Sequence, residues 1–413
     1  MLFWSKKSSM NDENYFALAI PFFIGGMLIE LVYQWVTKRA LYRFDDLITN
    51  LSCGIGQQVI DIFLKVIILG IYSWVYENLR FFKIQPNIYT WILLFILIDL
   101  CFYWFHRFAH QVNILWGTHI VHHQSEEFNF SVALRQSWFD NLFNIIFYLP
   151  LALIGFDTIS FFVLFSFNTI YQFIIHTKLI GQVGFLEYFL NTPSHHRVHH
   201  GKNHQYIDKN YGGVFIIWDK LFGTFQKEQE TVIYGITTPI LSFNPMVLNF
   251  AYWIHLIKDL KKISIPSVKV AYLFAKPGTI ASDTLELPPY IAKFSVQLKT
   301  MTSHISTLKG RLYIGWHFLL IILFFIVLID FEPFYTFTEK ILSALYILST
   351  LTILGILLSV RKTFRFVEGV RIVFSIFILW ILIRDIIAYS LHIIILYTLI
   401  NSLVFIILSD EKK

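Results

Sequence analysis

Charged residues are scarce in this 413-residue chain, because Asp, Glu, Lys and Arg together make up only 15% of it. An ordinary soluble domain contains about 25%. Hydrophobic residues reach 56%, and the apolar blocks are long enough to cross a bilayer. This composition excludes a disordered chain and argues against an ordinary soluble enzyme. The net charge of +6 rests on few charges, which favours contact with a membrane surface and not with nucleic acid.

Cysteine is also nearly absent, since the chain has only Cys53 and Cys101, both in apolar stretches. Two such residues build neither a disulfide framework nor a cysteine metal site. No His-Pro-Gly-Gly haem motif and no GxGxxG nucleotide loop occurs, so no reductase is fused to the chain. Any redox chemistry would therefore need an external electron donor.

The apolar segments predict an all-α, polytopic bundle of membrane helices. The expected membrane segments are residues 15–36, 55–79, 89–105, 312–329, 341–360, 370–383 and 386–408, with 141–175 forming two short helices or a re-entrant hairpin. Asp61 and Lys65, four residues apart, are expected to pair or to face the bundle interior. A cluster of basic residues lies between two of these segments, and by the positive-inside rule it favours a cytoplasmic position for that connection. It consists of Arg361, Lys362, Arg365 and Arg371.

Changes in composition divide the chain into four expected parts. Residues 1–88 would form N-terminal membrane helices, and residues 89–230 a core that carries the histidine motifs. Lysines, prolines and polar residues return after these motifs. Residues 231–309 would therefore form a helical extramembrane or interfacial cap over the site, and residues 310–413 C-terminal membrane helices.

Histidine is the residue type that stands out, with fifteen copies, eleven of them between His106 and His204. They form the motifs HRFAH, HIVHH and HHRVHH. The motif residues are His106 and His110; His119, His122 and His123; and His196, His199 and His200, preceded by His195. Residues at i, i+3 and i+4 share one helix face, so each motif directs its imidazoles toward one point. Imidazole suits iron, zinc, copper and nickel.

Eight motif histidines exceed the needs of a single ion, since a tetrahedral zinc takes four ligands. Two ions, each with three or more nitrogens and an open position, would use them all. The motifs contain no cysteine and no carboxylate, unlike soluble carboxylate-bridged di-iron bundles. A nitrogen-rich metal pair beside a membrane suits dioxygen activation and attack on a lipid C–H bond.

The motifs and their surroundings resemble the fatty acid hydroxylase/sterol desaturase superfamily of membrane di-iron oxygenases. Four stretches look most like its tetrahydrobiopterin-dependent, ether-lipid-cleaving branch, the alkylglycerol monooxygenases. They are HRFAHQVNILWGTHIVHHQSEEFNFSVALRQS, IHTKLIG, PSHHRVHHGKN and NYGGVFIIWDKLFGTF. The resemblance covers roughly residues 100–228, and it implies that the eight motif histidines hold two iron ions and that His176 is a further ligand. His195 would be a ligand or a hydrogen-bond donor to one. Gln172 stands where related hydroxylases carry another histidine.

Several polar residues near the motifs are further candidates. Asp99 lies two helical turns before His106 and is expected to orient a ligand or to form a structural pair. Glu126, Glu127 and Asn129 form either a solvated turn with a helix cap or a contact to substrate or pterin. Candidates for binding a headgroup or cofactor are Arg135 and Gln136, with an interfacial arginine as the alternative. Asp219 is a candidate for orienting a histidine of the third motif.

The leading hypothesis is a membrane di-iron monooxygenase that hydroxylates the O-alkyl carbon of alkylglycerol ethers. It would use O2, a membrane lipid substrate and an external electron donor, with tetrahydrobiopterin implied by the resemblance and zinc able to replace iron on purification. The site would face the cytoplasm from the endoplasmic reticulum of a eukaryote or the inner membrane of a bacterium. The alternatives are a sterol desaturase, methyl oxidase or other lipid hydroxylase with a redox protein and, more distantly, a histidine-rich metal transporter.

Overall fold

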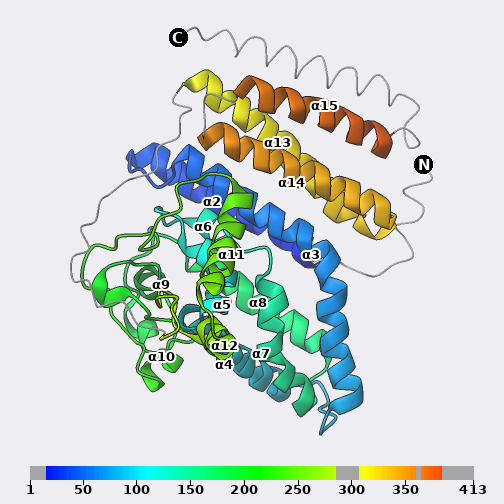
Figure 1. The fold of residues 1–413 in the computed structure, drawn as a ribbon. Helices are drawn as coiled ribbons and strands as arrows, with labels where there is room; N and C mark the ends of the chain where they lie inside the picture. Colours follow the sequence, from blue (N-terminus) through cyan, green and yellow to red (C-terminus); the bar gives the residue numbers. More distant parts are fainter. Residues whose placement is uncertain (1–14, 285–306, 360–363, 384–413) are drawn as a thin grey trace.

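The computed structural model describes residues 15–284, 307–359 and 364–383, and this part of the chain is helical, as predicted (Figure 1). Extended backbone pairs there only at two isolated bridges, Leu190 with Phe215 and Gly201 with Tyr234. The longer elements are α2 (Tyr15–Thr37), α3 (Phe44–Leu79), α4 (Ile88–Gln111), α5 (Asn113–His123), α7 (Asp140–Ile154), α8 (Thr158–Ile174), α11 (Pro245–Lys262), α12 (Pro266–Phe274), α13 (Leu308–Phe331), α14 (Phe337–Ser359) and α15 (Phe364–Ile383). The short elements are α6 (Phe130–Ala133), η2 (Gly184–Tyr188), α9 (Pro193–His199), η3 (His204–Tyr206), α10 (Ile217–Leu221) and η4 (Glu332–Phe334).

Five helices in the described residues are long and apolar enough to cross a membrane. They cover Ile20–Thr37, Phe44–Leu79, Ile88–Gln111, Leu308–Phe334 and Phe337–Ser359. Between Asp140 and Ile174 the chain forms two shorter apolar helices, α7 and α8. The chain is therefore a multi-pass membrane protein by helix length and composition. The segment expected at 386–408 lies outside the described residues.

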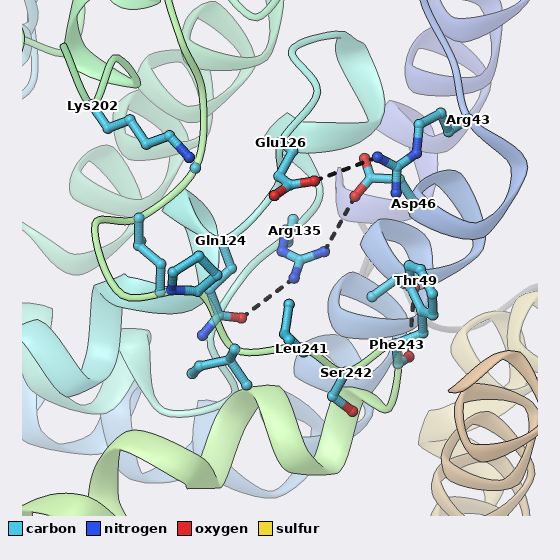
Figure 2. A pocket seen from close by; sticks show the side chains of 14 residues that line it. Arg43, Asp46, Thr49, Gln124, Glu126, Arg135, Lys202, Leu241, Ser242 and Phe243 are labelled. Carbon is cyan, nitrogen blue, oxygen red and sulfur yellow. Dashed lines mark hydrogen bonds and ion pairs between the residues drawn. The ribbon is translucent and has the colours of Figure 1, made fainter. Parts of the chain in front are cut away.

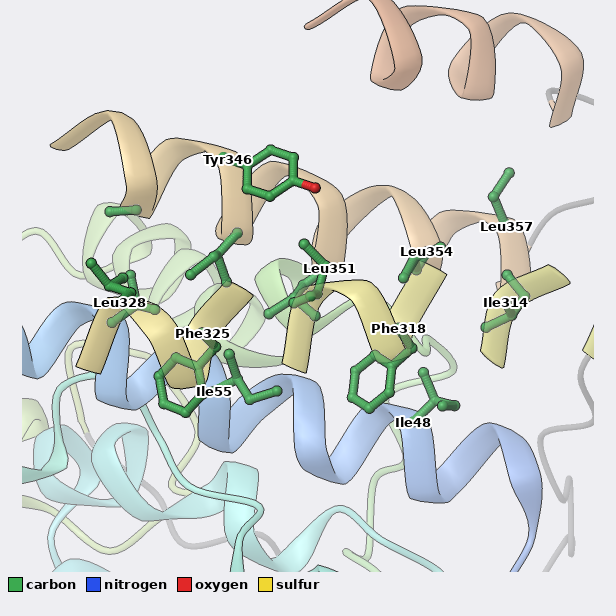
Figure 3. Close-up of a cluster of buried hydrophobic side chains, with 14 of the residues drawn as sticks. Ile48, Ile55, Ile314, Phe318, Phe325, Leu328, Tyr346, Leu351, Leu354 and Leu357 are labelled. Atoms are coloured by element: carbon green, nitrogen blue, oxygen red, sulfur yellow. The ribbon is translucent and has the colours of Figure 1, made fainter. Parts of the chain in front are cut away.

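The long helix α3 connects two apolar cores. Its first half packs against α13 and α14, where Ile48 and Ile55 meet Phe318 and Leu351 (Figure 3). Its second half packs against α4, α7 and α8, with Tyr72 stacked on Phe161 at 4.3 Å between ring centroids. In Figure 1, α13, α14 and α15 lie on one side of α3 and the histidine-bearing helices on the other. The helices α13 and α14 thus pack on the first half of α3, on the side away from the histidine-bearing helices.

The helix α3 begins earlier than the expected segment 55–79, because polar residues in its first turns are buried by protein and not by lipid. Asn50 donates to the Asp46 carboxylate at 2.9 Å, and Arg135 donates to Asn50 at 2.8 Å. Asp61 and Lys65 do not bind each other. Asp61 accepts from Asn141 at 2.7 Å, and Lys65 pairs with Glu332 at 2.8 Å.

Arg371, expected in the basic cluster between two membrane segments, is instead buried within the helix α15. It is 1% exposed within α15, where its guanidinium donates to Glu368 and contacts His317 of α13 at 3.1 Å. A buried arginine needs such partners. Arg371 therefore joins helices and carries no information about which side faces the cytoplasm.

Candidate metal centre

Four short segments bring the histidines together. The last two turns of α4 carry His106 and His110, and α5 carries the second motif at its C-terminal end. His176 follows the end of α8, and the seven-residue helix α9 carries the third motif up to His199, with His200 as its C-cap. Pro193 begins α9, since a proline has no N–H to lose in the first turn of a helix. All three motifs therefore lie on helices, as their spacing predicts.

The histidine side chains form two groups, each able to hold a metal ion. The first group is His106, His110, His119, His123 and His199; the second is His122, His176, His196 and His200. Within each group one ligand atom per residue lies within 4.8 Å of every other. The groups adjoin, because the rings of His123 and His200 lie 4.5 Å apart. The structure thus brings together nine of the ten histidines predicted as ligands.

Hydrogen bonds to backbone carbonyls fix which ring nitrogen is free in four of these histidines. His106 Nδ1 lies 2.8 Å from the Tyr211 carbonyl and His122 Nδ1 3.1 Å from the Arg135 carbonyl. His176 and His199 meet the carbonyls of Gln172 and Lys209 at 2.6 and 2.9 Å. A carbonyl only accepts, so Nδ1 carries the proton and Nε2 of each neutral ring presents a lone pair.

These lone pairs face one another at short range. Nε2 of His122 and Nε2 of His176 are 3.1 Å apart, although neither has a proton to donate to the other. Nε2 of His123 lies 3.1 Å from Nε2 of His110, His119 and His199 alike, and one proton cannot serve three acceptors. Two nitrogens bound to one ion at about 2.1 Å and about 90° would lie about 3.0 Å apart. The arrangement therefore matches cation binding and not a hydrogen-bonded cluster.

Burial keeps the imidazoles in the neutral form that a metal ion requires. It lowers the pKa of His122 to about 4, and it lowers the pKa of His119, His176 and His199 well below the ordinary value. Nearby histidines lower these last three pKa values further. The donor set is all nitrogen, which suits iron or zinc and does not suit magnesium or calcium.

A left-handed turn after η3 orients one of these ligands. Asp208 and Asn210 have φ of 59° and 56°, a region that short polar side chains tolerate better than most. The turn presents the carbonyl of Lys209, between them, to His199. Asn210 holds the turn by donating to the carbonyls of His195 and Gln226 at 3.0 and 2.7 Å.

Two buried carboxylates hold the loop that supplies the acceptor for His106. Asp219 accepts from the backbone N–H groups of Tyr211 and Gly212, both at 2.8 Å. It therefore supports a first-motif ligand through Tyr211 and not the third motif, which corrects the expectation. Asp99 accepts from Val214, Phe215, Trp218 and Asn168 at 2.6 to 2.9 Å and contacts the same loop.

His195 and Gln172 lie outside both histidine groups. The His195 ring packs against Phe225, with 5.4 Å between ring centroids, although the next residue, His196, belongs to the second group. The Gln172 side chain donates to Asn168 at 2.6 Å, so it does not replace the missing family histidine. His204, His255 and His317 are likewise absent from the two groups.

Three polar residues that follow the second motif, Gln124, Glu126 and Arg135, line a pocket beside the centre (Figure 2). Glu126 lines it and pairs with Arg43 at 3.5 Å, while Arg135 donates to Val121 and Gln124. The other candidates lie elsewhere. Glu127 pairs with Lys178 at 3.6 Å, Asn129 caps α6 by accepting from the Ser131 N–H, and Gln136 donates to the Ala133 carbonyl.

The sequence alone did not reveal several residues that hold the centre in place. Arg197 forms two hydrogen bonds with Glu228 at 2.8 and 2.7 Å and also donates to the carbonyls beside His176, at Thr177 and Ile180. Glu30 of α2 accepts from Thr177 at 2.5 Å. The sequence could have pointed to Glu30, because an acidic residue within an apolar segment usually has a function. The backbone carbonyls that accept from the histidine rings could not be identified from the sequence.

We expect the metal-free protein to lose thermal stability as the pH falls from 7 to 5. Buried histidines with lowered pKa stay neutral in the folded protein, whereas the unfolded chain takes up protons below about pH 6.5. Each such histidine costs up to about 1.4 kcal/mol per pH unit. Melting temperatures of chelator-treated protein would measure this. A melting temperature that is constant or rises on acidification would contradict this expectation.

Comparisons with known proteins agree with this geometry. The Fatty acid hydroxylase family profile matches residues 91–224, which contain both histidine groups. The chain is 39% identical to alkylglycerol monooxygenase of Danio rerio over 358 residues, which is 86% of this chain and 80% of that protein. The chain is 35% identical to alkylglycerol monooxygenase of Xenopus tropicalis, over 91% of this chain and 84% of that protein. The Homo sapiens enzyme is 46% identical over 60% of this chain, and the match spans 58% of that enzyme.

More distant relatives match a smaller share of the chain. Ornithine lipid hydroxylase OlsE of Rhizobium tropici is 30% identical over 34% of this chain. No solved structure matches. The coverage of the fish and frog enzymes shows that the similarity extends well beyond the histidine motifs. The chain therefore belongs to the fatty acid hydroxylase family and is similar within it to the alkylglycerol monooxygenases.

Proposed function

We propose that this protein is a membrane di-iron monooxygenase that cleaves alkylglycerol ethers. The observation that carries the proposal is the pair of adjoining all-histidine groups at the end of an apolar helix. The similarity to alkylglycerol monooxygenases over most of the chain selects the substrate. Tetrahydrobiopterin is proposed as the reductant on the same similarity.

Nine imidazoles would hold the two iron ions, five on one and four on the other. When bound, the iron pair would supply activation of O2, so that one oxygen atom enters a C–H bond and two electrons from the donor reduce the other to water. Hydroxylation next to the ether oxygen gives a hemiacetal, which collapses to a fatty aldehyde and a glycerol derivative. The chain itself contributes fixed ligand positions, which the carbonyls of Tyr211, Arg135, Gln172 and Lys209 maintain.

Aromatic side chains close one side of the second group. Phe128 stacks on His176 with 5.6 Å between ring centroids, and Tyr234 stacks on Phe128 at 5.2 Å. Lys178 lies over the outer face of Tyr234 at 4.9 Å. This layer excludes water from the second group, which protects reactive oxygen chemistry from side reactions.

The polar pocket is our proposed site for the polar end of the lipid or for the pterin. Arg43, Glu126 and Lys202 line it, and both kinds of ligand present hydroxyl or amide groups that these side chains can bind (Figure 2). Gln124 and Arg135 link the pocket to the centre. Gln124 directly follows His123, and the Arg135 carbonyl faces His122. We further propose that the site faces the cytoplasm, where a soluble reductant is available.

Turnover by the purified, iron-loaded protein tests the proposal. With O2, tetrahydrobiopterin and a defined alkylglycerol, we expect fatty aldehyde to form, and omission of any one component should reduce it to background. Zinc-loaded protein is the matched control, because it binds the same ligands without redox activity. No aldehyde from fully iron-loaded protein would refute the substrate assignment.

The second candidate is a sterol desaturase, methyl oxidase or other lipid hydroxylase that uses a redox protein. The 24% identity to a sterol 5(6)-desaturase of Schizosaccharomyces pombe, over half of this chain, is the observation in its favour. Product from a sterol or acyl lipid with a reductase, and none from an alkylglycerol with pterin, would select it. A metal transporter is less consistent with the site, because the nine histidines form one compact centre and not a path across the membrane.

A further inference from the structure

Outside the candidate membrane helices, the segment around η2 exposes an unusual density of large apolar side chains. We call this surface the η2 face. It consists of Val183, Phe185, Leu186, Tyr188, Phe189 and the nearby Leu221 of α10. Phe185 is 71% exposed, Tyr188 65% and Leu221 70%. Several large exposed apolar side chains close together in a short segment mark a contact with a partner or a membrane.

The η2 face is tied to the middle of a candidate membrane helix. Leu190 pairs with Phe215, and the N–H groups of Val214 and Phe215 both donate to Asp99 of α4. Asp99 lies about 18 Å from the end of α4 at Gln111, at 1.5 Å per residue. The Phe215 ring also meets Phe95, one turn further from that end, at 6.2 Å. The segment therefore lies alongside a part of α4 that membrane insertion would place in or next to the hydrocarbon.

The backbone of this segment has the partners that a membrane environment demands. Lys220 donates through Nζ to the carbonyls of Glu187 and Tyr188 at 3.0 and 2.9 Å, and its amine lies over the Tyr188 ring at 5.3 Å. The N–H of Ile216 donates to the Phe189 carbonyl at 3.0 Å. Non-helical backbone at membrane depth persists only where the protein satisfies its polar groups. A lysine within the membrane pairs with backbone carbonyls, as Lys220 does here.

We propose that the η2 face is immersed in the lipid bilayer, level with the middle of α4, and anchors the third histidine motif to the membrane. The connection to the motif is direct. Glu187 of η2 accepts from Ser194 and Thr192, at the start of α9, at 2.7 and 3.2 Å. The partner is the bilayer itself, because Phe215, which pairs with Leu190 of this segment, packs against Phe95 and Asp99 of a candidate membrane span. The part of the chain expected to form the histidine core would thus have a membrane contact in addition to its spanning helix α4.

Depth-dependent fluorescence quenching tests this with the full chain in lipid nanodiscs. In a background without Cys53 and Cys101, single cysteines at Phe185 and Tyr188 carry a nitrobenzoxadiazole label. Ile92→Cys, on an exposed side of α4, is the lipid-facing reference, and Gln205→Cys, on the exposed η3, is the aqueous reference. We expect lipids with spin-labelled acyl chains to quench the Phe185 and Tyr188 labels to within about twofold of Ile92, with iodide quenching only Gln205.

Two results would overturn the proposal. Labels at Phe185 and Tyr188 that iodide quenches as strongly as Gln205 would place the η2 face in water. Labels protected from both quenchers would show that another protein surface, such as a second copy of the chain, covers it. Neither readout depends on iron, pterin or turnover, so the proposal stands or falls separately from the enzymatic function.

Discussion

Replacing His196 by alanine is expected to abolish turnover, whereas replacing its neighbour His195 is expected to leave most of it. His196 is one of four ligands in the second group, where its Nε2 lies 2.9 Å from that of His176. Without the His196 ring, three imidazole nitrogens remain for the ion of the second group, and the positions of these three ligands are disturbed. We expect the bound metal to fall from two ions per chain toward one, and activity to fall at least about 100-fold.

The His195→Ala variant is a matched control, because the two residues are adjacent in the same helix and equally buried. The His195 ring turns toward Phe225, away from both groups. We expect two ions per chain in this variant and turnover within about threefold of the parent protein. Metal content by mass spectrometry and aldehyde formation are the two measurements. Equal metal loss in both variants would show that the two-group assignment is wrong.

The sequence predicted the histidine groups well because the chemistry of imidazole is visible in the residue type itself. Histidine at i, i+3 and i+4 on a helix has one plausible use in an apolar chain, and the structure groups every motif histidine accordingly. His176, which no motif supports, came only from family resemblance. The apolar segments likewise predicted the long helices α2, α4, α13 and α14.

Features that depend on tertiary partners could not be predicted. The start of α3 was misplaced because Asp46 and Asn50 look exposed in the sequence, yet protein side chains bury them. Arg371 looked like a cytoplasmic charge and is a buried link between helices. The backbone carbonyls that orient His106 and His199 cannot be recognised in the sequence, because every residue type has a carbonyl. These errors concern long-range contacts, which local patterns do not report.

Replacing Asp99 by alanine is expected to have the largest effect on stability. Its buried carboxylate accepts four hydrogen bonds, from Val214, Phe215, Trp218 and Asn168. A buried donor left without an acceptor costs about 1–3 kcal/mol, so we expect a loss on the order of 4 kcal/mol after relaxation. The melting temperature of the detergent-solubilised protein should fall clearly. Bound iron and turnover should also fall by at least about tenfold, because the same loop presents the Tyr211 carbonyl to His106.

Two variants separate this role from a general weakening of the fold. Trp218→Phe removes one of the four hydrogen bonds and keeps the ring packing, so it should cost about 1 kcal/mol and leave the iron content unchanged. Gly213→Ala should act like Asp99→Ala, because a Cβ there would lie 2.6 Å from the Asp99 carboxylate oxygen and push the loop away from α4. If Asp99→Ala retained full iron and turnover despite a lower melting temperature, the carboxylate would only stabilise the fold. Loss of iron in both Asp99→Ala and Gly213→Ala, with retention in Trp218→Phe, would show that Asp99 positions the metal centre through this loop.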